Sequence, residues 1–175
     1  VAGTGHIQRY DDLLANVRKD GRFHSIRSLV QPDDPEVREV ARVLVQASDF
    51  ISASQEFVNS FTTYRDEEGD YWETPAEVLA ERGADCDGKA ILLCSILRNY
   101  IAPDKIFCAF GLCNGGDSIG HMFVVTEGKD ECDRIIEATT GPSESFNGKY
   151  IIHGIFNDCY AFSTDVGLRE INLKP

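Results

Sequence analysis

The sequence has no long hydrophobic run. No apolar stretch approaches the roughly 20 residues that a helix needs to cross a bilayer. The start of the chain also lacks the basic and then apolar pattern of a signal peptide. We therefore expect a soluble protein without a membrane span. Because the chain begins at Val1 and not at Met, this expectation does not extend to a leader sequence.

Basic residues are scarce. The chain has 17 Lys and Arg residues against 29 Asp and Glu residues, so its formal net charge is −12 at pH 7. A surface this acidic repels the phosphate backbone of nucleic acids, which are therefore not expected partners. The same charge favours encounters with neutral or basic molecules, but it does not identify a substrate.

Cysteine is too rare for a scaffold built on disulfides, because six cysteines in 175 residues are far fewer than a small secreted domain uses. Most of them are expected to be free thiols, which favours a cytoplasmic location. Cys108 and Cys113 do not have the spacing of a zinc finger, and no matching Cys/His pair completes a tetrahedral site. We expect no metal and no cofactor.

Length and hydrophobic content indicate one domain. A chain of 175 residues, 42% of them hydrophobic, is long enough to bury a core of its own and short enough for a single core. Residues 1–100 are expected to be helical and residues 105–175 to form mainly strands. Helices followed by strands, without regular alternation, predict an α+β domain over 1–175. In it, N-terminal helices and a central helix pack on an antiparallel sheet.

Apolar periodicity and start signals predict the individual elements. The predicted helices cover residues 9–19, 35–62 as one helix or as two with a break near Ser48-Asp49, 74–83 and 86–100. Asp34 is the expected N-cap of the second, and Thr74 and Glu77 form a capping box. The last helix is apolar nearly all round and is therefore expected to be buried on several sides. Strands are predicted over residues 105–112, 121–126, 134–139, 150–153 and 158–162.

Cys86 is the strongest candidate for chemistry, because it falls in the first turn of the apolar helix 86–100. The unpaired amides and the positive end of the helix dipole stabilise a thiolate at this position. The backbone amide of Cys86 itself is able to donate to an oxyanion. A nucleophile and half of an oxyanion hole therefore coincide there.

A thiol nucleophile needs a base, and His121 is the best placed of four histidines. It opens a predicted strand after the glycine-rich segment 114–120, where a substrate is able to approach closely. The next predicted strand carries Glu137 in an otherwise apolar run, and a lone carboxylate in such a run requires a partner.

The register between these two strands decides whether the side chains meet. In a hairpin with Glu127 opposite Asp133, Phe123 lies opposite Glu137, and His121 lies diagonally on the same face. A register shifted by one residue would place His121 and Glu137 on opposite faces. In the first register, Glu137 orients the imidazole and stabilises its charged form, as the acid of a catalytic triad does.

Two other candidate sites are less favoured. The acidic segment 64–72, with Gly69 inside it, is typical of a solvated turn, because it lacks the alternating acidic ligands of an EF-hand calcium loop. His153 and Cys159 offer a second possible dyad, but both fall in apolar strands without a helix terminus.

The motifs around Cys86 resemble the transglutaminase-like superfamily, and in particular the bacterial transglutaminase-like cysteine proteinases. That group has an Asn-containing helix, an acidic loop, a Trp-x-x-Pro-x-Glu-x-Leu element and a Gly-Asp-Cys helix start, followed by His and Asp on adjacent strands. The matching segments here are Phe57-Val-Asn59, residues 64–72, Trp72 to Leu79, and Gly83-Ala-Asp85-Cys86. The likeness runs from about Asn59 to Thr139, nearly half of the chain.

The resemblance implies a papain-like fold, with Cys86 as the nucleophile, His121 as the general base and acid, and Glu137 as the orienting carboxylate. Three features depart from the family pattern. Ala84 separates the glycine from the aspartate, the acidic continuation after the cysteine is reduced to Asp87-Gly88, and Glu137 replaces the commoner aspartate. Calcium dependence, known in some relatives, is therefore not carried over to this chain.

A cysteine hydrolase is the leading hypothesis. Cys86 would attack a peptide, isopeptide or related amide bond of a protein or peptide substrate, and water would release the thioester acyl-enzyme. A protein-glutamine acyltransferase would use the same triad and pass the acyl group to an amine. A non-catalytic binding module on the same fold is the third hypothesis. Gln55, Asn59 and Trp72 carry donors upstream of Cys86, but the second oxyanion donor stays unassigned.

Overall fold

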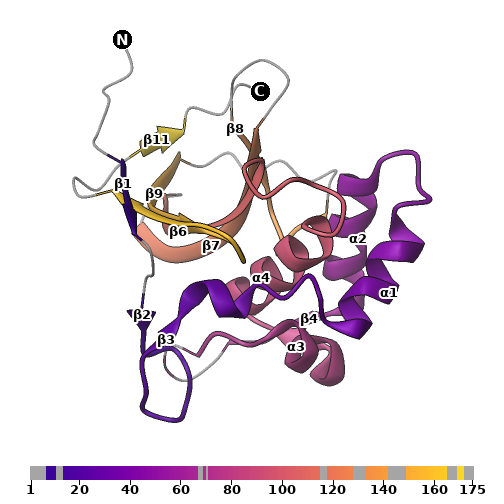
Figure 1. The fold of residues 1–175 in the computed structure, drawn as a ribbon, viewed down its shortest axis with the longest axis horizontal. Coiled ribbons are helices and arrows are strands. Elements are labelled where there is room, and N and C mark those ends of the chain that lie inside the picture. Colours follow the sequence, from indigo (N-terminus) through magenta and orange to yellow (C-terminus); the bar gives the residue numbers. More distant parts are fainter. Residues whose placement is uncertain are drawn as a thin grey trace.

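The described part of the chain forms an antiparallel sheet with its helices gathered to one side (Figure 1). This computed structural model describes residues 7–10, 14–66, 69, 71–114, 118–127, 133–141, 149–164 and 169–171. The arrangement confirms the predicted α+β class. Within these residues, no helix is both long and apolar enough to cross a membrane.

The first helices begin where the sequence signals predict. After the 3-10 helix η1 (Ile26–Leu29) come α1 (Pro35–Leu44) and α2 (Phe50–Phe61). The Asp34 side chain caps α1 by accepting hydrogen bonds from two backbone amides, as expected. The predicted stretch 35–62 is therefore two helices, and Asp49 caps the second one through the amide of Ser52.

The capping box predicted at Thr74 and Glu77 is present at the start of α3 (Pro75–Glu81). The helix stops because Arg82 adopts a left-handed conformation with a φ of 52°. After the two-residue strand β5 (Gly83–Ala84) the chain enters α4 (Cys86–Leu97), the predicted apolar helix.

The strands pair mainly with neighbours that follow them in the chain. They are β1 (Ile7–Tyr10), β2 (Leu14–Ala15), β3 (His24–Ser25), β4 (Thr63–Tyr64), β5 (Gly83–Ala84), β6 (Ile106–Asn114), β7 (Ser118–Glu127), β8 (Asp133–Ile136), β9 (Lys149–Phe156), β10 (Ala161–Thr164) and β11 (Arg169–Ile171). In the described residues the main sheet has the order β1-β10-β9-β6-β7-β8, with β11 paired to β9. The short pairs β2-β3 and β4-β5 lie outside it.

Helix α4 is the centre of the core. Its residues Asp87–Leu97 are all buried. The helix contacts β6 and β7 of the sheet as well as α1, α2 and α3, and Figure 1 shows it between the sheet and the other helices. A helix that is apolar nearly all round fits this position, because it is packed on several sides. Its first residue, Cys86, therefore lies near β7, the strand that carries His121.

The predicted helix over 9–19 is wrong. β1 pairs with β10, and β2 pairs with β3. Val17 is buried, and its carbonyl accepts a hydrogen bond from the amide of Trp72 at 2.9 Å. In a helix these backbone groups would form hydrogen bonds with one another, but here their partners are in other segments of the chain. The spacing of apolar residues within 9–19 does not reveal such partners.

The last predicted strand, 158–162, begins later than expected. Asn157 closes a turn in front of β10, because its side-chain oxygen accepts the amide hydrogens of Cys159 and Tyr160, both at 2.9 Å. Cys159 is consequently exposed in a turn and not part of a strand. The other described cysteines, Cys86, Cys94, Cys108 and Cys113, are free thiols as expected, and Cys132 lies outside the described residues.

The β7-β8 hairpin has the register that the sequence favours. Glu127 pairs with Asp133, and the ladder ends where Val124 pairs with Ile136. The strand predicted over 134–139 therefore stops one residue before Glu137. Because the shifted register is excluded, Glu137 lies on the same face of the hairpin as His121, and the two side chains are in contact.

Candidate active site

Cys86 is the first residue of α4 and is partly exposed. The Asp85 side chain caps the helix by accepting a hydrogen bond from the amide of Asp87 at 3.0 Å. This cap holds the chain in an extended conformation up to Asp85 and starts the helix at the cysteine. Cys86 therefore belongs to the first turn of α4, as the sequence predicts.

His121 and Glu137 meet across the β7-β8 hairpin. The Nε2 atom of His121 lies 3.1 Å from Oε1 and 3.0 Å from Oε2 of Glu137. Both side chains are withdrawn from solvent, with 16% of His121 and 7% of Glu137 exposed. Glu137 also accepts hydrogen bonds from the hydroxyl groups of Tyr150 and Thr139. A buried carboxylate with several donors is able to hold the imidazole in one orientation.

Cys86 and His121 line the same cleft, and the thiol is close enough to act on the pKa of the imidazole. Burial alone would lower the pKa of His121. The hydrogen bonds and negative charges of Cys86 and Glu137 outweigh burial and raise the pKa of His121 to about 10. The imidazole is therefore protonated at neutral pH in this setting, and it contacts the carboxylate of Glu137. The structure thus brings together all three side chains singled out in the sequence.

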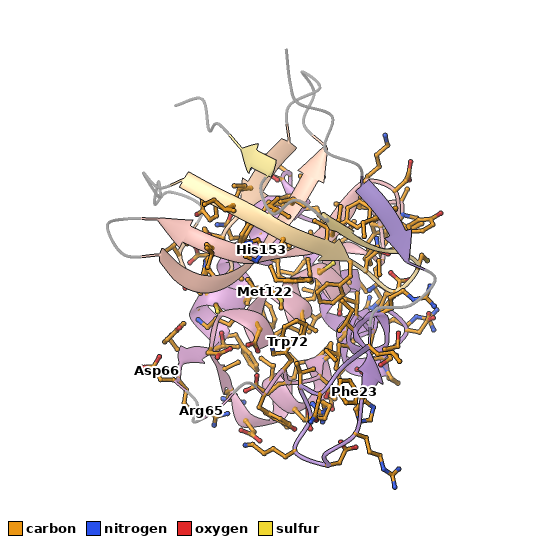
Figure 2. All side chains as sticks on the ribbon, turned by 90° about the vertical axis from the view of Figure 1, so that its left-hand side faces the viewer. Phe23, Arg65, Asp66, Trp72, Met122 and His153 are labelled. Atoms are coloured by element: carbon orange, nitrogen blue, oxygen red, sulfur yellow. The ribbon has the colours of Figure 1, made fainter. Side chains whose placement is uncertain are left out.

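A cleft of about 300 Å³ opens beside Cys86 and His121. Its other lining residues are Trp72, Asp85, Asp87, Phe110, Gly111, Gly120, Met122 and His153. Figure 2 looks onto this side of the molecule, where Trp72, Met122 and His153 follow one another from the helical part towards the sheet. Apolar walls with a few polar groups are typical of a site that binds an extended organic substrate.

His153 enters this cleft through an irregularity in the sheet. The register between β6 and β9 shifts between Phe110 and Gly111, so that His153 is the extra residue on β9. Bulges of this kind redirect a side chain, and they are common beside active sites. Gly111 is required there, because a Cβ atom at this position would lie 1.8 Å from the carbonyl oxygen of Ile151.

The alternative dyad of His153 and Cys159 gains no support. His153 lines the cleft, whereas Cys159 lies in the turn before β10, where its thiol contacts Arg98 and Asp158. The redirection of His153 was not foreseen in the sequence, because a bulge depends on pairing with another strand. Only Gly111 and Gly154, on the two paired strands, hint at it.

Two of the three upstream donors considered for the oxyanion hole are engaged elsewhere. Gln55 donates to the backbone carbonyls of Glu137 at 2.9 Å and Thr140 at 3.2 Å. The Asn59 amide, oriented to satisfy both of its ends, pairs with the carbonyl of Thr139 and the amide of Gly141. Helix α2 thus holds the segment that carries Glu137. The third donor, Trp72, lines the cleft and stacks on Phe156.

Three carboxylates gather around the start of α4. Oxygen atoms of Glu73, Asp85 and Asp87 all lie within 4.8 Å of one another. Glu73 is 2% exposed and Asp87 is 7% exposed. The Oδ1 atom of Asp87 is buried and has no hydrogen-bond partner in the described part of the chain. Burial, and then the negative charge of Asp85, raise the pKa of Asp87 to about 10.

This group of oxygen ligands, which we call the carboxylate cluster, suits a hard cation such as Ca²⁺. A cation would relieve the repulsion between the three groups, which Arg65, 3.5 Å from Glu73, offsets only in part. Gly88 makes room for the cluster, since a Cβ atom there would lie 2.5 Å from Oε2 of Glu73. The carboxylate of Glu73 therefore occupies the space beside Gly88, the residue that ends the short acidic segment after Cys86. Glu73 is not predictable as a ligand from the sequence, because only the turn before α3 brings it to α4.

Solved structures of LapG from Legionella pneumophila resemble this chain. The EGTA-treated form has a TM-score of 0.54 and 18% sequence identity, over 81% of this chain and 84% of that chain. The calcium-bound form has the same TM-score of 0.54 and 16% identity, over 83% of this chain and 94% of that chain. No family model and no curated protein matches the chain. The comparisons therefore establish that this chain has an α+β fold that resembles the transglutaminase-like fold of LapG.

Proposed function

We propose that this chain is a cysteine protease that hydrolyses an amide bond in a protein or peptide substrate. The observation that carries the proposal is the contact between His121 and Glu137 at the wall of a cleft that Cys86 also lines. The fold supports it, because LapG is a calcium-dependent cysteine protease of the transglutaminase-like fold. The motifs around Cys86 resemble the same group of proteinases.

The acylation step follows from the way His121 faces Glu137 beside the cleft that Cys86 lines. Nε2 of His121 faces Glu137, so Nδ1 is the ring nitrogen left for the thiol. The Cys86 sulfur attacks the substrate carbonyl carbon and forms a tetrahedral intermediate, whose oxyanion accepts a hydrogen bond from the Cys86 amide. His121 gives its proton to the leaving nitrogen, the C–N bond breaks, and a thioester with Cys86 remains.

Deacylation uses the same residues in reverse order. His121, now neutral, takes a proton from a water molecule that attacks the thioester carbonyl. The C–S bond breaks, the carboxylic acid product leaves, and the proton on His121 restores its pairing with the sulfur. Glu137 keeps the imidazole in one orientation through both steps and stabilises its charged form.

We infer that the carboxylate cluster holds a calcium ion. This differs from the expectation from the sequence, which was that no metal is bound. Glu73, Asp85 and Asp87 are the residues that would bind it. One of the similar LapG structures is calcium-bound. The bound ion would neutralise the buried carboxylates on either side of Cys86. With the ion bound, Asp85 and Asp87 would hold the first turn of α4, and with it the Cys86 thiol, in place.

Selective labelling of the thiol tests the proposed function without knowledge of the substrate. We expect iodoacetamide at neutral pH, followed by peptide mapping, to modify Cys86 faster than the other cysteines. His121→Ala should slow this labelling by about tenfold or more, because the Cys86 sulfur loses the positive charge of the imidazole that favours its reactive form. His24→Ala is the matched control, since His24 pairs with Asp20 on the surface. Equal labelling of all six cysteines would contradict the catalytic role of Cys86 and favour a binding module.

The acceptor of the acyl group distinguishes a hydrolase from an acyltransferase. Both reactions use the same acyl-enzyme, so the product has to be analysed with and without a primary amine. We expect the free acid in both cases. An amine-dependent crosslink to a glutamine substrate, in place of the acid, would replace the hydrolase assignment with that of a protein-glutamine acyltransferase.

A further inference from the structure

Tyr150 is a buried tyrosine whose hydroxyl group lies against Glu137. It comes near the start of β9 and has 0% of its surface exposed. The hydroxyl group donates a hydrogen bond to Oε1 of Glu137 at 2.6 Å. This short distance is typical of a hydrogen bond from a hydroxyl group to a charged carboxylate, which is stronger than a bond between neutral groups.

The position of Glu137 explains why it needs this support. The residue lies just beyond the end of β8, so the β7-β8 ladder does not hold its backbone directly. Its side chain is one methylene longer than the aspartate of related proteinases and therefore has one more bond to rotate. On the other oxygen, Oε2, the hydroxyl group of Thr139 donates at a longer distance of 3.2 Å.

The ring of Tyr150 is itself fixed by packing. Its centroid lies 4.6 Å from that of Phe123 in an edge-to-face arrangement and 6.4 Å from the imidazole centroid of His121. Phe123 and His121 are both on β7, so Tyr150 is packed against the strand that carries the imidazole. A rigid donor of this kind is able to keep a carboxylate in one rotamer.

We propose that Tyr150 is a positioning residue, which acts through Glu137 to hold the imidazole of His121 in line with Cys86. The inference rests on the proposed function, because it concerns the same three residues. Tyr150 does not touch the substrate in this proposal. It holds Oε1 of Glu137, and Glu137 in turn holds Nε2 of His121.

The test compares Tyr150→Phe with the wild-type protein by the rate of iodoacetamide labelling at Cys86. Removal of the hydroxyl group should slow labelling by about tenfold, because a hydrogen bond to a charged group is lost. Tyr100→Phe is the matched control, since Tyr100 is 53% exposed. It should label at the wild-type rate. Should Tyr150→Phe fail to fold, 4-fluorophenylalanine at position 150 fills the space of the hydroxyl group without donating, and is measured instead.

A double-mutant cycle separates positioning from a structural role. If Tyr150 acts through Glu137, then Tyr150→Phe slows labelling about tenfold in the wild-type background and less than about twofold in a Glu137→Gln background. Thermal unfolding of the same four proteins reports any structural effect. Equal slowing in both backgrounds, or a labelling rate unchanged by Tyr150→Phe, would overturn the proposal.

The outcomes also separate this inference from the proposed function. Fast labelling of Cys86 that depends on His121 and Glu137, but not on Tyr150, leaves the proposed function standing and refutes the positioning role alone. If wild-type Cys86 does not label faster than the other cysteines, both fail together.

Discussion

Glu137 accepts hydrogen bonds from side chains on three separate parts of the fold. His121 comes from β7, Tyr150 from β9, and Thr139 from the segment after β8. A glutamate in this place is therefore held by donors from three directions. Glu137 is the first residue past the end of β8, and there its carboxylate meets all three donors.

The pKa of His121 predicts a dependence of stability on pH. An ordinary histidine titrates at 6.5, whereas His121 in the folded protein titrates at about 10. Because the folded-state pKa is the higher one, the imidazolium stabilises the protein fully below pH 6.5. This stabilisation is lost as the pH rises through about 10. We expect His121→Ala to lower the melting temperature more at pH 6 than at pH 10.5, as measured by thermal unfolding. A constant difference across this range would contradict the proposed pairing.

The β-bulge at His153 requires a glycine at position 111, and this predicts a large loss of stability when that glycine is replaced. Gly111→Ala should destabilise the protein by roughly 3 kcal/mol or more, because the new Cβ atom would collide with the backbone of β9. Gly120→Ala is the matched control on the adjacent strand, since a Cβ atom there meets nothing within 4 Å. Urea unfolding of the two variants measures the difference. Similar stabilities would show that the bulge is not tightly packed.

The start of α3 joins two distant segments through an ion pair. Arg18 contacts both carboxylate oxygens of Glu77, at 2.8 and 2.7 Å, and also donates to the carbonyl of Trp72. The hydrogen bond from Arg18, with further bonds from Thr74 and Tyr71, lowers the pKa of Glu77 to about 2 against the burial that opposes it. Arg18 thereby links the N-terminal segment to Trp72, which lines the cleft.

This ion pair predicts a loss of stability in acid. The folded-state pKa of Glu77 is depressed, so its contribution is present above pH 4.5 and is lost as the pH falls towards about 2. Glu77→Gln should cost about 1 kcal/mol at pH 7, a modest value because Glu77 is a third exposed. The difference between variant and wild type should vanish near pH 2 in thermal unfolding. A difference that persists at pH 2 would assign the effect to the capping box alone.

The carboxylate cluster brings the turn before α3 next to the first turn of α4. A calcium ion bound there, as we propose, should therefore stabilise the folded protein. Calcium at about 100 times its Kd would stabilise the folded state by about 2.7 kcal/mol. For a chain of this length that corresponds to a rise in melting temperature of roughly 5 to 10 °C. EGTA should reverse the shift, and Glu73→Gln should reduce it. An unchanged melting temperature in the presence of calcium would contradict the proposed metal site.

Much of the fold follows from local signals in the sequence. The caps at Asp34 and Thr74 and the apolar run after Cys86 predict their helices, because capping and helical periodicity involve residues within a few positions of one another. The contact between His121 and Glu137 was also predictable. It depends on the register of a single hairpin, in which a shift by one residue would place the two side chains on opposite faces.

Other features arise only when distant segments pack together. The segment around Tyr10 forms a strand and not a helix because β10, from the far end of the chain, supplies its hydrogen-bond partners. The bulge at His153, the meeting of Glu73 with Asp87, and the bond from Tyr150 to Glu137 have the same origin. Each joins elements that are separate in the sequence. No local pattern encodes such contacts, since their geometry is set by the packing of the sheet and α4.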